Sequence, residues 1–400
     1  MAQLPFARKE QRVFWLLVAA GALAVAGGLA AAYAMEEHGH SITGMSNQVV
    51  WGLPHVFAIF LIVAASGVLN VASIGSVFGK PAYKARAPLS GLLSLAMLAG
   101  GLAVLMLDLG RPERLVVAAT HFNFRSVFAW NVFLYSGMFA IVAVYLWMLM
   151  EARMNPYAKP LGLAALGWRF VLTTGTGSIF GFLVARQAYQ SAVLAPMFIV
   201  LSLGWGLAVF LIVQSAIYAW NGLQLPAPVQ TRMVRLLGLF VAAGMYFVIV
   251  YHLTNLYWAR QVAFERFLLL DGEVYPWLFW SGYVVLGGIV PMAILFSPLP
   301  RGPLAAVAGS AFVLVGAFAQ LYVFIIGGQA YPLEIFPGYV AKSSFLDGAI
   351  DSYAPSLPEL LLGVGGLGIA FLITAAGVRV LRFVPQDDFG SHPAVLAAED

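Results

Sequence analysis

Long apolar runs, separated by short polar segments, occupy most of this 400-residue chain. Most of the runs approach or exceed the roughly 20 residues that an α-helix needs to cross a bilayer. There are about ten such runs, at about residues 14–34, 55–78, 88–108, 127–150, 162–186, 194–220, 234–258, 275–296, 304–327 and 358–382. The pattern predicts an all-α polytopic membrane protein with about ten transmembrane helices, in one integral membrane domain over residues 1–400.

Composition narrows the class of protein further. The chain is 62% hydrophobic and only 10% charged, and its mean hydropathy is +0.89, more than a soluble domain of this size tolerates. It contains no cysteine, which excludes thiolate-held iron–sulfur clusters and cysteine nucleophiles in this chain. Basic residues are scattered through short loops and form no stripe, so we expect no nucleic-acid partner. The first run lacks a small-residue cleavage site after it and is predicted to be a retained span.

Lysine and arginine predict the orientation, because they are enriched in cytoplasmic segments. With the N-terminus in the cytoplasm, about 14 of these residues fall in inner segments and about 7 in outer ones. Arg169 is counted with the inner set. The two long loops, at about 35–54 and 328–357, then lie outside, and both termini are expected to be cytoplasmic.

The segment LDLGRPERLVVAATHFNFRSVFAW, at residues 107–130, collects ionisable groups at one membrane end. Such groups are costly there unless they serve a function. One interpretation makes Arg111 the partner that holds Asp108 ionised; another makes Asp108 a carboxyl that exchanges protons at the membrane edge. The alternative without a function is that Gly110 and Pro112 end a helix and the arginines extend to lipid headgroups.

Three histidines are candidates for proton transfer, because an imidazole titrates near neutral pH. His55 follows Trp51 at the start of the second run, His121 lies in the loop before the fourth, and His252 lies in the outer third of the seventh. Each is equally compatible with a hydrogen-bonded structural role. His55 and His252 are also candidate axial ligands of a single b-type haem.

The middles of the runs are almost free of ionisable residues. They hold only short polar side chains, namely Ser66, Asn70, Thr174, Thr176, Ser178 and Gln320. The hydroxyls of residues 173–178 in the fifth run either permit close helix packing or line a water path from the inner side. A polar site is therefore predicted near the outer face, whereas secondary transporters usually bind substrate near the midplane.

Two short motifs in this chain resemble those of a known family. The residues DLGRP at 108–112, followed by HFNFRS at 121–126 and by Trp130, resemble the NrfD-like family of membrane subunits of the polysulfide reductase type. The resemblance is specific over about residues 50–190. The number of runs, with Glu359 before the last, is similar to the longer branch of the family. That branch includes the DsrP subunit of a sulfur-metabolism complex and the membrane subunit of certain nickel–iron hydrogenases.

The resemblance implies a fold of two four-helix bundles, at about 50–190 and 194–327, flanked by the first helix and by a last helix at 358–382. It implies a subunit of a respiratory or sulfur-metabolism electron-transfer complex in the cytoplasmic (inner) membrane of a bacterium or archaeon. Such subunits carry no haem or iron–sulfur cluster. They bind menaquinone or ubiquinone near the outer face and exchange electrons with a periplasmic ferredoxin-like iron–sulfur protein and further redox subunits.

A quinone headgroup needs hydrogen-bond partners for two oxygens and a route for two protons. In this hypothesis the catalytic residues are Asp108, His55, His121 and His252, and the residues contacting the quinone are Trp51, Arg111, Asn123, Trp130, Arg186 and Tyr251. No metal ligands are predicted. A secondary transporter, a single-haem membrane cytochrome and a passive scaffold are the alternatives. Quinone chemistry without a dedicated proton pump is favoured, because the midplane lacks a chain of acidic, basic or imidazole groups.

Overall fold

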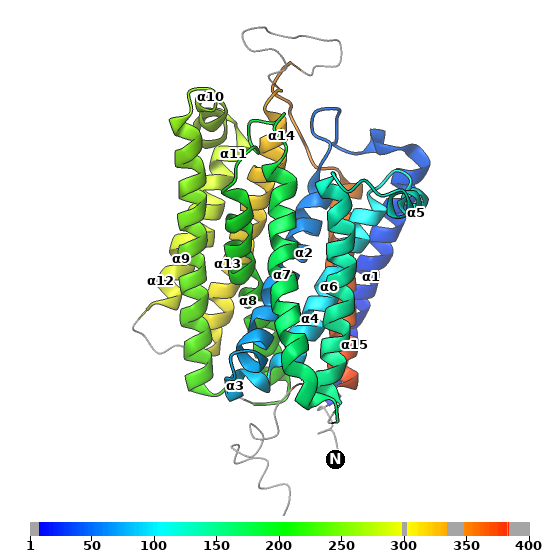
Figure 1. Cartoon of the computed structure of the whole chain (residues 1–400), viewed down its shortest axis with the longest axis vertical. Coiled ribbons are helices and arrows are strands. Elements are labelled where there is room, and N and C mark those ends of the chain that lie inside the picture. The colour runs from blue at the N-terminus through cyan, green and yellow to red at the C-terminus, as the bar shows by residue number, and fades with distance from the viewer. Residues whose placement is uncertain are drawn as a thin grey trace, which may run out of the picture.

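Long helices run side by side through the whole molecule and form one elongated bundle (Figure 1). The computed structural model describes residues 8–151, 153–223, 225–297, 302–333, 348–381 and 383, and these residues are helical or irregular, with no strand. The long helices are α1 (Arg8–His38), α2 (Leu53–Ser76), α4 (Ala87–Leu107), α6 (Val127–Met150), α7 (Ala158–Gly181), α8 (Leu194–Trp220), α9 (Ala227–Tyr257), α13 (Pro303–Tyr322) and α15 (Leu357–Val380).

One further long helix and the continuation of α13 contain π-helical turns, which are uncommon and often lie at functional sites. The eighth predicted run consists of α11 (Val274–Trp277), the π-helical η5 (Leu278–Ile289) and α12 (Val290–Leu295). The ninth continues from α13 through the π-helical η6 (Val323–Gly327) into α14 (Gly328–Ala330). The short elements are η1 (His40–Ile42), α3 (Pro81–Lys84), η2 (Pro112–Arg114), α5 (Leu115–Thr120), η3 (Asn155–Tyr157), α10 (Val262–Arg266) and η4 (Phe267–Asp271).

Nine helices of the described chain are long and apolar enough to cross a membrane. The all-α polytopic fold predicted from the sequence is therefore confirmed. The predicted fifth span, at 162–186, corresponds to α7, which is not among the nine and ends at Gly181. Helix α7 carries Lys159, Arg169 and several hydroxyl residues, but it lies in the bundle against α2, α6 and α8.

Helix contacts fall into two rings. Helices α2, α4, α6 and α7 contact one another in that order and close the ring between α7 and α2. Helices α8, α9, α12 and α13 do the same, and α1 packs along α15, which covers α4 and α2. The rings contain the helices of the two predicted four-helix bundles. Because α2 also packs closely along α8 and joins the rings into one body, the division into two bundles stays a prediction.

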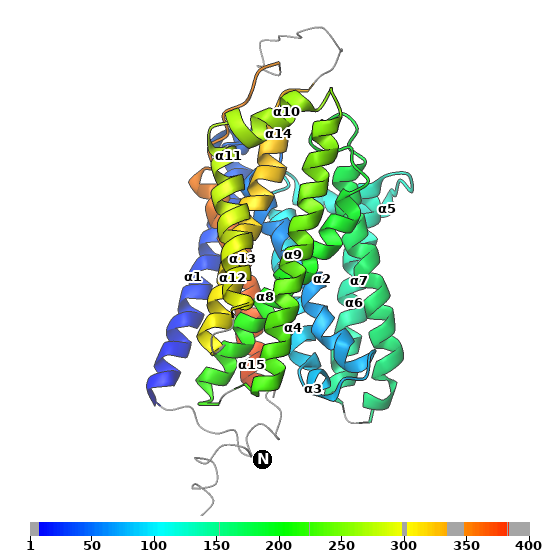
Figure 2. The same cartoon turned by 90° about the vertical axis from the view of Figure 1, so that its left-hand side faces the viewer.

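The two ends of the bundle differ in what they carry. We call the end where α2 and α8 begin and where α4, α7 and α9 finish the site end, and the other the opposite end (Figures 1 and 2). The assignment of the site end to the outer side of the membrane stays a prediction. Both chain termini lie outside the described residues, as do segment 334–347 of the second long loop and Arg301 and Arg382 of the orientation set.

Arg169 does not lie in an inner segment, where the sequence analysis placed it. Its side chain is among the largest that are fully buried, in the middle of α7 and facing α2. Hydropathy alone does not reveal this position, because the helix that carries Arg169 is rich in glycine and hydroxyl residues and resembles a span end.

Close approach of α2 and α8 depends on two glycines. A Cβ atom on Gly67 would lie 1.6 Å from the carbonyl oxygen of Ser202, and one on Gly206 would lie 2.2 Å from the amide nitrogen of Val68. Backbones that approach this closely gain van der Waals contact, which holds helices together where lipid removes the hydrophobic driving force.

We expect Gly67→Ala to destabilise the protein by about 2 kcal/mol or more, because the added methyl group forces α2 away from α8. Thermal unfolding in detergent measures the loss. Gly167→Ala on α7 is the matched control, since no atom lies within 4 Å of its Cβ position. That change should be neutral or stabilise by up to about 1 kcal/mol through helix propensity. Equal effects of the two substitutions would contradict the packing argument.

Candidate functional site

His55, which is partly exposed, and the buried Asp108 form an imidazole–carboxylate pair at the site end. His55 lies in the first turn of α2, which Pro54 helps to start, and Asp108 ends α4. The Nδ1 atom of His55 lies 3.1 Å from Oδ2 of Asp108, within ion-pair distance, although the pair lacks hydrogen-bond geometry. The side chain of His55 is 21% exposed and that of Asp108 only 3%. The two residues come from different helices, so the fold brings together two of the predicted catalytic residues.

Asp108 retains unused hydrogen-bonding capacity. Its Oδ1 atom is buried and has no hydrogen-bond partner within the described residues. Arg111 is exposed and makes no ion pair with Asp108 in the part of the chain that the structure describes. The interpretation in which Arg111 holds Asp108 ionised is therefore wrong. The cause is the turn after α4, which carries Arg111 outward while Asp108 stays between the helices.

Trp51 is fixed beside this pair by an amide side chain from a distant helix. Gln329, in α14, accepts from the backbone N–H of Trp51 at 3.0 Å and donates to its carbonyl oxygen at 2.9 Å. The indole ring lies 6.1 Å from the imidazole of His55 and 5.6 Å from the ring of Phe180, measured between centroids. The extended segment before α2 therefore has its polar backbone satisfied, and Trp51 forms a rigid apolar wall next to His55.

Arg186 supports the same segment from the loop after α7. Its guanidinium donates to the carbonyl oxygens of Gln329 at 2.9 Å and of Gln48 at 2.6 Å. Burial lowers the pKa of Arg186, but its ordinary value is so high that the group stays charged. Nearby, burial raises the pKa of Tyr189, so its hydroxyl stays protonated and donates to the carbonyl of Ile325 at 2.9 Å. In this structure Arg186 braces the polypeptide next to the site.

A second buried acid–imidazole pair lies on α9 and α10. The Nδ1 atom of His252 lies 2.7 Å from Oε2 of Glu265, and Asn255 donates to Oε1 of the same carboxylate at 2.7 Å. The Glu265 side chain is fully buried. Both carboxylate oxygens are thus occupied, which is the arrangement of a structural clamp between α9 and the loop that follows it.

Aromatic rings fill the space between the two pairs. From Trp51 the contacts pass to Tyr189 at 6.3 Å, then to Phe324 at 5.3 Å, to Tyr251 at 6.2 Å and finally to His252 at 4.9 Å. The side chains of both histidines therefore lie against an aromatic cluster. This arrangement does not favour a haem held between His55 and His252.

The remaining predicted residues lie on an exposed segment at the side of the site end. Helix α5 and the following loop project from the bundle there (Figure 2). His121 is exposed, with Nδ1 3.1 Å from the hydroxyl of Thr120, and the indole of Trp130 donates to the carbonyl of Phe124. Asn123 accepts from the backbone of Arg125. The predicted single polar cluster is thus divided into three groups, because the loop folds outward. They are the His55–Asp108 pair, the His252–Glu265 pair and the exposed segment that carries His121.

Two residues that organise the site end, Gln329 and Glu265, were not predicted from the sequence. Gln329 binds backbone groups 278 and 279 positions away, which no local pattern indicates. Glu265, on the short helix α10, binds His252 and Asn255 on α9, and this pairing depends on the turn between the two helices. Glu359, in contrast, carries a visible signal, since Ser356 and Glu359 form a capping box at the start of α15. Its buried carboxylate also accepts from the hydroxyl of Tyr353 at 2.5 Å and the amide of Gly44 at 2.8 Å. Burial raises the pKa of Tyr353, so this phenol remains a donor.

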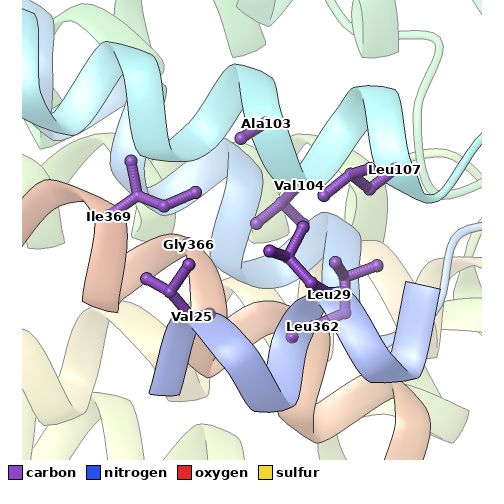
Figure 3. A pocket seen from close by; sticks show the side chains of 10 residues that line it. Val25, Leu29, Ala103, Val104, Leu107, Leu362, Gly366 and Ile369 are labelled. Carbon is purple, nitrogen blue, oxygen red and sulfur yellow. The ribbon is translucent and has the colours of Figure 1, made fainter. Parts of the chain in front are cut away.

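An apolar groove lies between α1, α4 and α15 (Figure 3), and Leu107 lines it. It is lined by Val25, Gly28, Leu29, Ala103, Val104, Leu107, Leu362, Gly365, Gly366 and Ile369. Its enclosed part holds about 10 Å³, room for about one water molecule. A second small cavity lies inside the other ring, beside Trp205 and Tyr283. Neither accommodates a ring-sized ligand, and the described residues contain no group of three or more His, Asp or Glu suited to a metal ion.

Comparison with known proteins shows similarity over most of the chain. A family model described as polysulphide reductase, NrfD, matches residues 41–332, which cover both rings and extend well beyond 50–190. The chain is 29% identical to the Hdr-like menaquinol oxidoreductase integral membrane subunit of Archaeoglobus fulgidus, over 88% of this chain and 89% of that protein. It is 28% identical to a putative dimethyl sulfoxide reductase membrane subunit of Halobacterium salinarum, over 92% and 90%. It is 21% identical to the menaquinone reductase integral membrane subunit of Nitratidesulfovibrio vulgaris, over 90% and 89%.

We expect Glu265→Leu to destabilise the protein by about 3 kcal/mol, because it leaves the buried donors of His252 and Asn255 without an acceptor. Glu265→Gln keeps an oxygen at the same place and should cost about 1 kcal/mol. Thermal unfolding in detergent compares the two variants. Equal losses would show that the carboxylate does not act as an acceptor for both groups.

Proposed function

Because this chain belongs to the NrfD family, we propose that it binds a quinone or quinol headgroup beside His55 and Asp108 as part of an electron-transfer complex. Its relatives include integral membrane subunits of menaquinol oxidoreductase and reductase complexes. The observation that carries the proposal is the pair of a partly exposed His55 and a buried Asp108, in which Oδ1 of Asp108 has no partner within the described residues. A buried carboxylate oxygen without a partner is costly unless a ligand completes it.

The donor and acceptor set fits the chemistry of a quinol. Oxidation of a quinol removes two electrons and two protons from its two hydroxyl groups. His55 accepts one proton on the imidazole nitrogen that faces the headgroup, while the carboxylate of Asp108 stabilises the resulting imidazolium. The second proton leaves the other hydroxyl and passes through a bound water to Oδ1 of Asp108, and the two electrons pass to the partner protein. Quinone reduction uses the same residues in reverse.

The headgroup enters from the exposed side of His55, since the two cavities described above are too small to enclose it. Trp51 forms the apolar wall on one side of the imidazole. Tyr251 and His252 lie at the far end of the aromatic cluster and belong to the second pair. The direct contacts predicted for Arg111, His121, Asn123 and Trp130 stay predictions that the geometry does not favour.

The electrons need a partner, because the chain has no cysteine to hold an iron–sulfur cluster. We place the iron–sulfur protein at the site end, which is the end closest to His55 and Asp108. The predicted partner is a periplasmic ferredoxin-like protein, together with further redox subunits. A sulfur-metabolism complex remains the favoured setting.

The groove of Figure 3 gives the isoprenoid tail a place to lie. Leu107 precedes Asp108 directly, and Val104 lies one turn deeper on α4. Ala58, one turn after His55 on α2, packs in the same cluster as Val104 and Leu362. The groove therefore begins under the proposed headgroup site and runs toward the middle of the bundle, with a wholly apolar lining suited to a prenyl chain.

We expect Asp108→Asn and His55→Ala each to lower quinol-linked turnover by about 100-fold or more, the usual scale for loss of a general acid–base group. Turnover is measured in the assembled complex, and subunit content checks that assembly is intact. His121→Ala is the matched histidine control and should keep turnover within about threefold.

Unchanged turnover in both Asp108→Asn and His55→Ala would remove the proposed site. Binding of a quinone analogue to the purified complex separates this function from a transporter or a scaffold, which should not bind it. A Soret band in the optical spectrum of the purified chain would instead support the cytochrome alternative.

For the tail we expect Leu29→Trp to raise KM for a long-tailed isoprenoid quinol about tenfold while leaving KM for a tail-less analogue unchanged, because the indole fills an apolar groove. Leu29 is 52% exposed on α1 and lines the groove. Leu23→Trp, at a 73% exposed leucine of the same helix that does not line it, is the control. Equal KM ratios in the two variants would exclude the groove as the tail site.

A further inference from the structure

A line of polar side chains runs through the interior of the first ring, between α2, α6 and α7. Near the opposite end the hydroxyls of Ser76 and Tyr145 lie 2.5 Å apart, and in the middle those of Ser66 and Thr173 lie 2.6 Å apart. We call this line the polar ladder; it comprises Ser76, Tyr145, Asn70, Ser66, Thr173, Thr176, Tyr135 and Asn131. Hydroxyl and amide groups conduct protons when water connects them, so the ladder is a potential leak from the opposite end toward His55.

Arg169 crosses the middle of the polar ladder. Its guanidinium donates to Oδ1 of Asn70 at 3.1 Å and to the carbonyl oxygen of Ser66 at 3.4 Å, and Nε has no partner in the described chain. Its carbon Cζ lies 4.4 Å from the centroid of the Phe170 ring. Only 2% of the residue is exposed.

None of these partners carries a negative charge. No carboxylate within the described residues lies at ion-pair distance from Arg169, whereas His55 and His252 at the site end each have one. The acids at the ends of the other first-ring helices also leave Arg169 without a negative partner. Asp108, after α4, faces His55, and Glu151, after α6, is exposed. A buried cation without a negative partner is expensive, because no opposite charge repays the loss of its hydration. Its presence therefore indicates a function that needs positive charge.

A fixed cation in an apolar bundle opposes the passage of other cations. The Coulomb energy between two charges a few ångströms apart is several-fold larger inside a protein than in water. A hydronium ion or an excess proton on the polar ladder must pass within contact distance of the guanidinium. Arginine residues exclude protons from water-conducting pores by the same effect.

We propose that Arg169 is an electrostatic barrier that closes the polar ladder to protons. The first ring then insulates the His55–Asp108 site from the opposite side of the membrane. If the proposed quinone function holds, on which this consequence rests, both protons of quinol oxidation exchange at the site end. The ladder serves helix packing through its hydrogen bonds, and the arginine removes the leak that such a row of hydroxyls creates.

The test is passive proton flux through the full-length chain reconstituted in vesicles, driven by a potassium gradient with valinomycin and followed with an internal pH dye. Arg169→Met removes the charge at similar length, and Arg169→Lys keeps the charge. We expect Arg169→Met to raise proton flux at least about tenfold over the original chain, and Arg169→Lys to stay within about threefold. No quinone is present, so the result does not depend on whether the quinone function is correct.

Two further variants make the outcome decisive. Adding Ser66→Ala and Thr173→Val to Arg169→Met interrupts the ladder and should return the flux to the original level. Arg169→Gln, which keeps a donor for Asn70 without the charge, replaces Arg169→Met if that variant does not fold. Three results would each overturn the proposal. The flux could stay low in Arg169→Met, it could rise equally in Arg169→Lys, or it could persist after Ser66→Ala and Thr173→Val are added.

Discussion

Polar groups inside an apolar bundle must find their partners within the chain, and this constraint organises the whole site end. The segment that enters α2 is not helical, so its backbone amides and carbonyls need acceptors and donors from elsewhere. Gln329 supplies them for Trp51, and Arg186 caps the carbonyls of Gln48 and Gln329. Glu359 has the same role in the loop before α2, because its carboxylate accepts from the backbone N–H of Gly44. These bonds fix the start of α2, and with it the direction in which His55 points.

The π-helical turn η6 contributes to the same arrangement of hydrogen bonds. In η6 the helix widens before α14 begins, which places Phe324 in the aromatic cluster and Gln329 beside Trp51. A regular α-helix through these residues would rotate the two side chains apart. The cost of the irregular turn is offset by the hydrogen bonds of Gln329 and by the buried aromatic contacts.

The two acid–imidazole pairs and the buried Arg169 lie at different depths of the bundle. Both acid–imidazole pairs lie at the site end, and the aromatic cluster lies between them. Away from that end the described core is mainly apolar, and its buried polar groups include the polar ladder, Arg169, Arg86 and Gln214. On the proposed function, electrons and protons are exchanged at the site end. The proposed barrier at Arg169 then insulates that end from the other side of the membrane.

The sequence by itself determined the helical membrane fold, the approximate spans and the family, because each depends on local composition or on a contiguous motif. It also placed His55 and Asp108 among four candidate catalytic residues, since ionisable residues are rare within the spans and gather at their predicted outer ends. Only the tertiary structure decided that Asp108 faces His55 and not Arg111, and that His121 lies apart. It alone revealed the roles of Gln329, which binds residues 278 and 279 positions away, and of Arg169. Hydropathy reports how apolar a stretch is, whereas pairing depends on which helix faces turn toward each other, and in a bundle that is decided by packing between distant segments.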